Sequence, residues 1–67
     1  MDDIEIRHVL PPELGNPIRR FRKIDRISQL LRMNDLDLLG IPGIGPKRLK
    51  MIEELLLKNG WRLGMLR

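Results

Sequence analysis

A chain of 67 residues provides one small domain, and because it opens with Met1 we expect a complete small protein. It contains no cysteine, which excludes disulfides and Cys-based zinc sites, so a single hydrophobic core must carry the stability. The net charge is +4, and only Phe21 and Trp61 are aromatic, so the core consists mainly of Leu, Ile and Met, a mixture that favours helices over a sheet.

The residue types disfavour catalysis. The sequence has one Ser, one His and no Thr, Tyr or Cys, whereas nucleophilic catalysis normally uses a Ser, Cys or Thr beside a base. A metal site would depend on His8 and scattered carboxylates. We therefore expect no enzyme activity, no metal and no cofactor. The apolar runs are too short to cross a membrane, so we expect no membrane partner.

Residues 1–16 differ from the rest of the chain in charge. They hold four acids and one Arg, a net −3, whereas residues 17–67 hold twelve basic residues and five acids, a net +7. Pro11-Pro12 and Gly15-Asn16-Pro17 interrupt any long element. We predict an extended or partly disordered N-terminal arm over residues 1–16. The basic domain over residues 17–67 favours nucleic acid or another polyanion, the alternative being a soluble surface with a positive bias.

A first helix is predicted to begin at Pro17, with Asn16 as its N-cap. From Ile18 to Ile27, apolar residues recur at every third position. Because that spacing drifts around an α-helix, we predict two short helices that break near Arg22-Lys23.

Two further helices follow. Asn34 is a suitable N-cap for a very short helix that ends at Gly40. Pro46 begins the last helix, which should end near residues 58–59, before Gly60. The tail, residues 61–67, is expected to fold back over the core. The predicted fold is therefore all-α, a compact bundle of four short helices.

The Gly- and Pro-rich turn between the last two helices, residues 41–46, carries the most information about function. Ile41 and Ile44 are expected to face the core. Gly43 and Gly45 lack a Cβ, so the backbone there can take a positive φ and approach another molecule closely.

The last helix adds positive charge beside this turn. Its first amides and its dipole form an anion site, next to Lys47, Arg48 and Lys50. Phosphate is the natural ligand, and phosphate contacts position a protein on a duplex without reading bases. The alternative is a structural hairpin that only joins two helices.

Residues 36–52, with the sequence Ile-Pro-Gly-Ile-Gly at their centre, resemble the helix-hairpin-helix DNA-binding motif. A wider resemblance covers residues 17–66 and is to the C-terminal domain of the bacterial RNA polymerase α subunit. It is carried by residues 24–31, 35–39, the hairpin, 49–52 and 59–65. That domain has the same order of short helices, and like this chain it has a Leu at the position of Leu49, where the general motif prefers Ala.

The resemblance implies a role linked to transcription, because that family binds A/T-rich promoter DNA in the minor groove and contacts activators and sigma factor. Gly45 and Lys47 match the hairpin Gly and Lys of the family. Arg48 replaces a small hydroxyl residue and Met51 an acidic one, so one polar contact is changed and another is absent.

The family also inserts an Arg into the groove from the start of its first helix. Leu14 falls near that place here, and Asn16 matches a family Asn if one residue is deleted. Arg19, Arg20 or Arg22 would then supply the guanidinium from the next turn.

We therefore predict a monomeric protein that binds double-stranded DNA, mainly through phosphate contacts and with a preference for A/T-rich sites. We expect it in the cytoplasm of a bacterium, as a bacterial or phage protein associated with the nucleoid. The predicted contact residues are Asn16, Arg19, Arg20, Arg22, Gly43, Gly45, Lys47, Arg48 and Lys50. Two alternatives stay open. One is a protein-interaction module that binds RNA polymerase, sigma factor or an activator with little affinity for DNA. The other is a DNA-targeting accessory domain of a nuclease or repair system.

Overall fold

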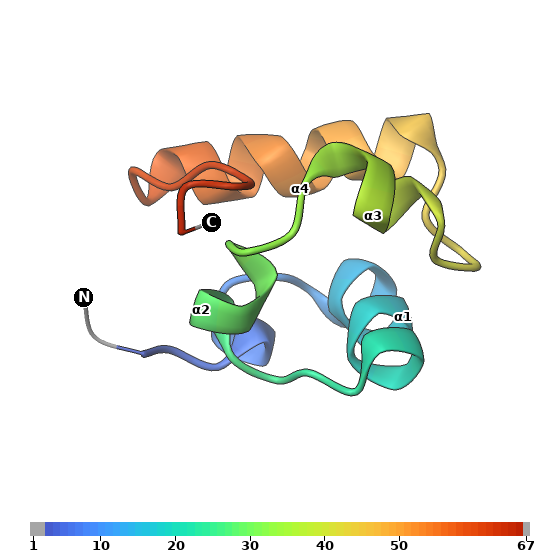
Figure 1. Cartoon of the computed structure of the whole chain (residues 1–67), viewed down its shortest axis with the longest axis horizontal. Helices are drawn as coiled ribbons and strands as arrows, with labels where there is room; N and C mark the ends of the chain where they lie inside the picture. Colours follow the sequence, from blue (N-terminus) through green and yellow to red (C-terminus); the bar gives the residue numbers. More distant parts are fainter. Residues whose placement is uncertain (1–2, 67) are drawn as a thin grey trace.

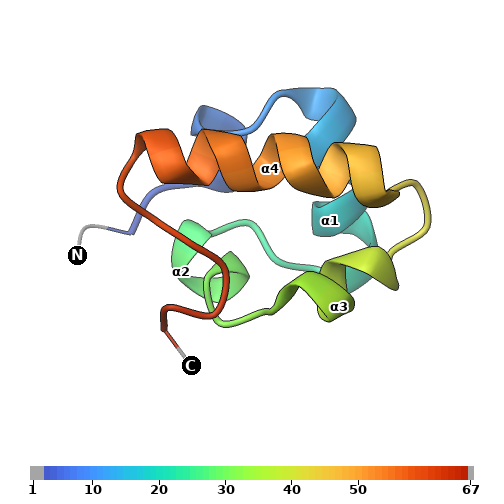
Figure 2. The ribbon, with the colours of Figure 1, turned by 90° about the horizontal axis from the view of Figure 1, so that it is seen from above.

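The computed structural model describes residues 3–66. These residues are all-helical, as predicted. The elements are a short 3-10 helix η1 (Ile6–His8) and the α-helices α1 (Pro12–Arg22), α2 (Ile27–Leu30), α3 (Asp35–Leu39) and α4 (Pro46–Lys58). They form two layers, with α3, α4 and the tail in one and η1, α1 and α2 in the other (Figure 1). From above, α4 runs along the length of the molecule and the tail turns back beside α2 (Figure 2).

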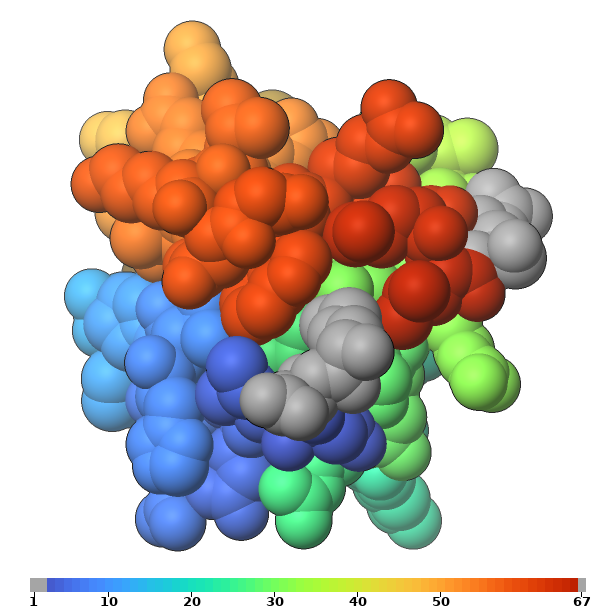
Figure 3. All heavy atoms as spheres, turned by 90° about the vertical axis from the view of Figure 1, so that its left-hand side faces the viewer, coloured from blue at the N-terminus to red at the C-terminus, as the bar shows by residue number. Residues whose placement is uncertain are grey.

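The N-terminal segment differs from the predicted arm. Residues 3–16 are part of the folded domain, and residues 1–2 lie outside the described residues. The Ile6 amide donates to the Asp25 carbonyl at 2.8 Å, and the Ile27 amide donates to the Ile4 carbonyl at 2.7 Å. Figure 3 shows this segment beneath the C-terminal half of α4. The predicted boundary between residues 16 and 17 is wrong, because α1 runs across it.

Burial explains this difference. Ile6, Leu10 and Leu14 are at most 1 % exposed, and they are three of the fourteen hydrophobic residues buried in the described part of the chain. A chain of this size buries only about 60 % of the surface that its unfolded form exposes, so these three side chains are a substantial part of a small core.

The predicted start of the first helix, at Pro17 with Asn16 as its N-cap, is also wrong. The helix begins at Pro12 and not at Pro17, and Pro17 lies inside it. Pro11 occupies the extended N-cap position and Pro12 the first helical position, where proline's fixed φ and missing N–H cost nothing. Asn16 is therefore an interior residue of α1 and not its cap.

The predicted break after α1, the cap of α3 and both ends of α4 are confirmed, whereas α2 begins only at Ile27. Helix α1 ends at Arg22, and Lys23 takes a left-handed conformation with φ 55°. The Asn34 side chain caps α3 by accepting from the Asp37 amide at 2.8 Å. Helix α4 begins at Pro46 and ends at Lys58, before Gly60 with its φ of 76°.

The two layers meet in one hydrophobic core. Ile41 and Ile44 of the hairpin are 2 % and 4 % exposed, as predicted. The tail folds back as predicted, since Trp61 packs against the core and the Leu66 amide donates to the Leu31 carbonyl at 3.2 Å. No helix among the described residues is long and apolar enough to cross a membrane.

Candidate nucleic-acid interface

An open groove of about 560 Å³ lies between the exposed side of α1 and the hairpin, and we call it the α1–hairpin groove. Its lining residues come from α1, the hairpin tip and the first turn of α4: Pro12, Glu13, Asn16, Pro17, Arg20, Phe21, Pro42 and Arg48. Three predicted contact residues, Asn16, Arg20 and Arg48, therefore meet at one surface.

The hairpin tip lies directly on α1 at Pro17. Gly43 has a φ of 93°, which favours glycine, and a Cβ at this position would lie 3.6 Å from two ring carbons of Pro17. The backbone of the tip thus turns tightly against the proline ring. This contact sets the distance between the two walls of the groove.

Arg48 holds the same two elements together. Pro17 has no N–H, so it cannot donate to the carbonyl four residues earlier, that of Glu13. One guanidinium nitrogen of Arg48 (Nη1) donates to this carbonyl at 3.3 Å and to the Gly43 carbonyl at 3.2 Å. Arg48 therefore has a structural role that the sequence did not reveal, while its other guanidinium nitrogens have no protein acceptor among residues 3–66.

Gly45 differs from Gly43. Its φ of −101° and ψ of −179° are extended, so the predicted positive φ is found at Gly43 but not at Gly45. A Cβ at Gly45 would meet no atom within 4 Å. The fold itself therefore does not need a glycine here, and the backbone is open to an approaching molecule.

The first turn of α4 is positively charged and lacks a side-chain cap. Gly45 is the N-cap, and the first turn contains no acidic residue. The Lys47 and Arg48 amides have no acceptors within the helix, whereas the Leu49 amide donates to the Gly45 carbonyl at 2.9 Å. Lys47 is exposed, and Lys50, three residues later, shares its side of the helix. Because Arg48 points to α1, these two lysines form a separate strip on the outer face of α4.

The basic residues of α1 do not all face the groove. Asn16, Arg19 and Arg20 line a shallow depression of about 300 Å³ next to it. Arg19 also lines a second depression with Glu5, Arg7 and Asp25, where carboxylates offset its charge.

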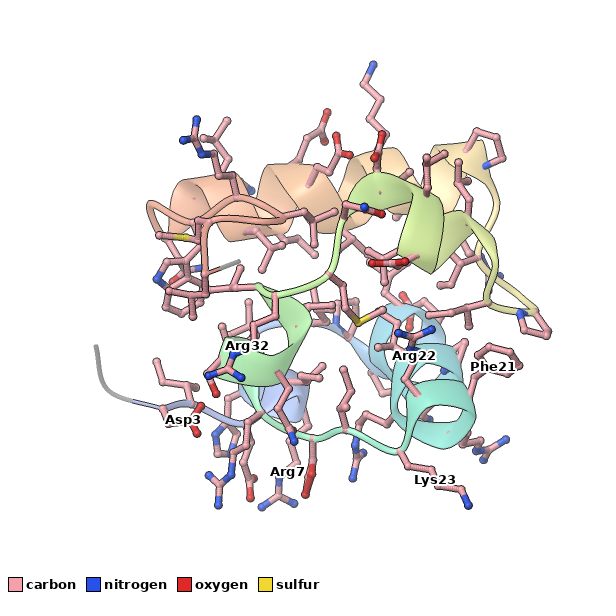
Figure 4. The ribbon with its side chains drawn as sticks, in the orientation of Figure 1. Asp3, Arg7, Phe21, Arg22, Lys23 and Arg32 are labelled. Carbon is pink, nitrogen blue, oxygen red and sulfur yellow. The ribbon has the colours of Figure 1, made fainter. Side chains whose placement is uncertain are left out.

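The end of α1 directs its side chains to different sides. Figure 4 shows that Phe21 and Lys23 project outward, whereas Arg22 turns back across the helix toward α3. Arg22 is therefore separated from the other predicted contact residues. The nine residues do not form a single patch, because α1 and α4 each present their cations on more than one side.

Two of the groove residues that were not predicted as contacts, Phe21 and Glu13, affect what the groove can bind. Phe21 is 53 % exposed although it continues the apolar spacing of the first helix. Glu13 places an acidic residue in the groove wall. The carboxyl could have been identified as a neighbour of Asn16 once α1 was known to begin at Pro12, since three residues in a helix bring two side chains to one face.

The basic side chains of this surface lack acidic partners. Within residues 3–66, an ion pair joins Glu5 to Arg7, and the same carboxylate lies 3.9 Å from the His8 imidazole, both far along the chain from the hairpin. The hydrogen bond from Arg7 holds the pKa of the Glu5 carboxyl below its ordinary value. Lys47, Lys50 and Arg20 therefore have no carboxylate partner among the described residues, and Arg48 contacts backbone carbonyls alone.

No protein-family model matches the chain, and no curated protein matches it in sequence. The surface itself therefore has to indicate the function.

Proposed function

We propose that the protein binds double-stranded DNA, mainly through phosphate contacts at the first turn of α4 and at the exposed side of α1. The observation that carries this proposal is the cationic, uncapped start of α4 beside an open backbone at Gly45. A phosphate there would accept hydrogen bonds from free amides and would lie next to Lys47.

The charge pattern of α4 supports an anionic ligand. A helix N-terminus carries a partial positive charge, so cations in the first turn are unfavourable by roughly 0.3–1 kcal/mol each. Lys47 and Arg48 both occupy this turn without a compensating acid. A bound phosphate would reverse the sign of this interaction. Local rules are commonly broken in this way where a site needs the charge for its ligand.

The arrangement of α1 and the hairpin suits a linear polyanion. Asn16 and Arg20 lie on one wall of the groove, and Arg48 lies on the other. The lysine strip of α4, Lys47 and Lys50, continues the positive surface beyond the hairpin. We propose a transcription-linked setting and a preference for A/T-rich DNA on the strength of the resemblance to the polymerase α domain.

The proposal is tested by fluorescence anisotropy with labelled A/T-rich and G/C-rich duplexes. The double variant Lys47→Glu/Lys50→Glu should lose at least tenfold in affinity, and its salt dependence should be shallower because fewer counterions are released. Lys47→Glu alone is compared with Lys58→Glu, which makes the same charge change at the other end of the same helix and is its matched control. Equal affinities of the wild type and the double variant would exclude this site.

A second candidate is a protein-interaction module that binds RNA polymerase, sigma factor or an activator. Leu36 and Leu57 favour it, because they are 72 % and 70 % exposed and lie away from the groove. A pulldown that retains RNA polymerase, together with no anisotropy change on any duplex, would select this alternative.

A further inference from the structure

The α1–hairpin groove combines an apolar floor with charged margins. Pro17 and Pro42 contribute apolar rings, and Phe21 contributes an aromatic ring that is 53 % exposed. Figure 4 shows Phe21 projecting from the last turn of α1 toward the side on which the hairpin lies. An exposed phenyl ring beside proline rings is a surface on which another flat, apolar group can stack.

The margins indicate what that group is attached to. Arg20 and Arg48 flank the apolar floor, and neither pairs with a carboxylate among residues 3–66. The ligand therefore has a flat apolar part and a negative charge close to it. A nucleotide has this chemistry, and the groove volume of about 560 Å³ lies within the usual range for small-ligand sites.

Whether a base can enter the groove depends on whether that base is paired in a double helix or is unpaired. In an intact double helix the faces of the bases are stacked on one another and are reached only after unstacking, which costs a few kcal/mol. A base that is already unpaired avoids this cost. Proteins that bind single strands combine these same two features, a basic groove for the backbone and an aromatic side chain for the base.

We propose that the α1–hairpin groove binds an unpaired nucleobase stacked on Phe21, with the flanking phosphates at Arg20 and at the outer nitrogens of Arg48. This inference rests on the proposed DNA binding and adds a ligand class to it. The preferred DNA carries a bulge, a gap, a flap or a single-stranded end. The phosphate contacts at α4 hold the adjoining duplex, and the groove holds the base that leaves it.

The test compares three labelled probes of one sequence: an intact duplex, the same duplex with one bulged thymine, and the single strand. The wild type should bind the two probes with unpaired bases more tightly than the intact duplex. Phe21→Ala should lose about five- to 150-fold in affinity for those two probes, the range expected for removal of one base–aromatic stack. Its affinity for the intact duplex should not change.

Two variants serve as controls. Phe21→Trp keeps an aromatic face and should restore the preference for unpaired bases. Leu57→Ala removes an apolar side chain that is 70 % exposed and lies outside the groove, and it should bind all three probes as the wild type does. Circular dichroism melts of each variant establish that the fold is retained.

The outcomes separate the two proposals. If the wild type binds the intact duplex but shows no preference for unpaired bases, this inference is overturned and the proposed function stands. If Phe21→Ala binds every probe as the wild type does, no base stacks on Phe21 and this inference is overturned. If no probe binds at all, both proposals are overturned.

Discussion

The guanidinium of Arg48 takes the place of the backbone donor that Pro17 lacks. In an uninterrupted helix, residue 17 would donate its amide to the Glu13 carbonyl. Here that carbonyl accepts from Arg48 at 3.3 Å, across 35 residues of sequence. The proline that interrupts the hydrogen bonds of α1 thereby creates an attachment point for α4.

This relationship predicts an energetic coupling between the two residues. Arg48→Ala should lower the free energy of unfolding by about 0.5–1.5 kcal/mol, the usual contribution of such hydrogen bonds. In a Pro17→Ala background, residue 17 supplies the amide, so Arg48→Ala should cost clearly less. Urea unfolding of the four proteins, followed by circular dichroism, measures the coupling. Strictly additive costs would show that the two residues act independently.

Because the N-terminal segment is buried, we expect the domain to need this segment in order to fold. Ile6 is fully buried, so Ile6→Ala should destabilise the protein by about 2–5 kcal/mol. For a domain of this size, such a loss is enough to populate the unfolded state at room temperature. His8→Ala, at an exposed site in the same short helix, should change stability by less than about 0.5 kcal/mol. Thermal melts of both variants distinguish a folded segment from a loose arm.

The two hairpin glycines should respond differently to alanine. Gly43→Ala forces a side chain into a left-handed backbone with φ 93°, and it should destabilise the fold by about 1–3 kcal/mol. Gly45→Ala meets open space and an ordinary φ, so stability should change by no more than about 1 kcal/mol.

DNA affinity separates the two glycines further. The Cβ of Gly45→Ala would stand where a phosphate is proposed to approach, so this variant should bind duplex DNA more weakly although its stability changes by no more than about 1 kcal/mol. Anisotropy and melting curves on the same samples provide both readouts. Unchanged affinity would remove Gly45 from the contact surface.

We expect the affinity for DNA to increase when the charge of the Glu13 carboxylate is removed. Its carboxyl lies in the groove wall that is proposed to face phosphates. Removing one like charge at this range is worth up to about 1 kcal/mol in water, so Glu13→Gln should bind up to about fivefold more tightly at low salt. The gain should shrink as salt is added. Glu53→Gln, outside the groove, is the matched control and should show no gain.

Because of the Glu5–Arg7 pair, we expect the stability of the fold to decrease slightly in acid. The hydrogen bond from Arg7 is the largest cause of the lowered pKa of Glu5, so the folded state holds the carboxylate more tightly than the unfolded state does. Its contribution is fully present above the ordinary carboxyl pKa and is lost as the pH falls through the lowered value. The difference in melting temperature between the wild type and Glu5→Gln should therefore narrow below a pH of about 4.5. A constant difference would argue against the pair.

Much of the C-terminal half could be predicted from the sequence because its signals are local. The Asn34 cap, Pro46 at a first helical position and Gly60 after the last helix each act within one turn of their own residue. The isoleucines of the hairpin alternate with glycines and prolines, so their burial follows from the turn itself. The positive charge of the start of α4 likewise depends only on neighbouring residues.

The N-terminal half was decided by the tertiary structure. Pro11-Pro12 is compatible both with the end of an element and with the start of a helix, and the burial of Ile6, Leu10 and Leu14 selects the second. No local signal places Arg48 on the Glu13 carbonyl or Phe21 beside the hairpin. The sequence by itself determined the charge of this protein and the helices of its C-terminal half. Its groove exists only because packing brings α1 against the hairpin and the start of α4, which are distant in the chain. The contacts between these segments stabilise the fold only after both segments have been brought together.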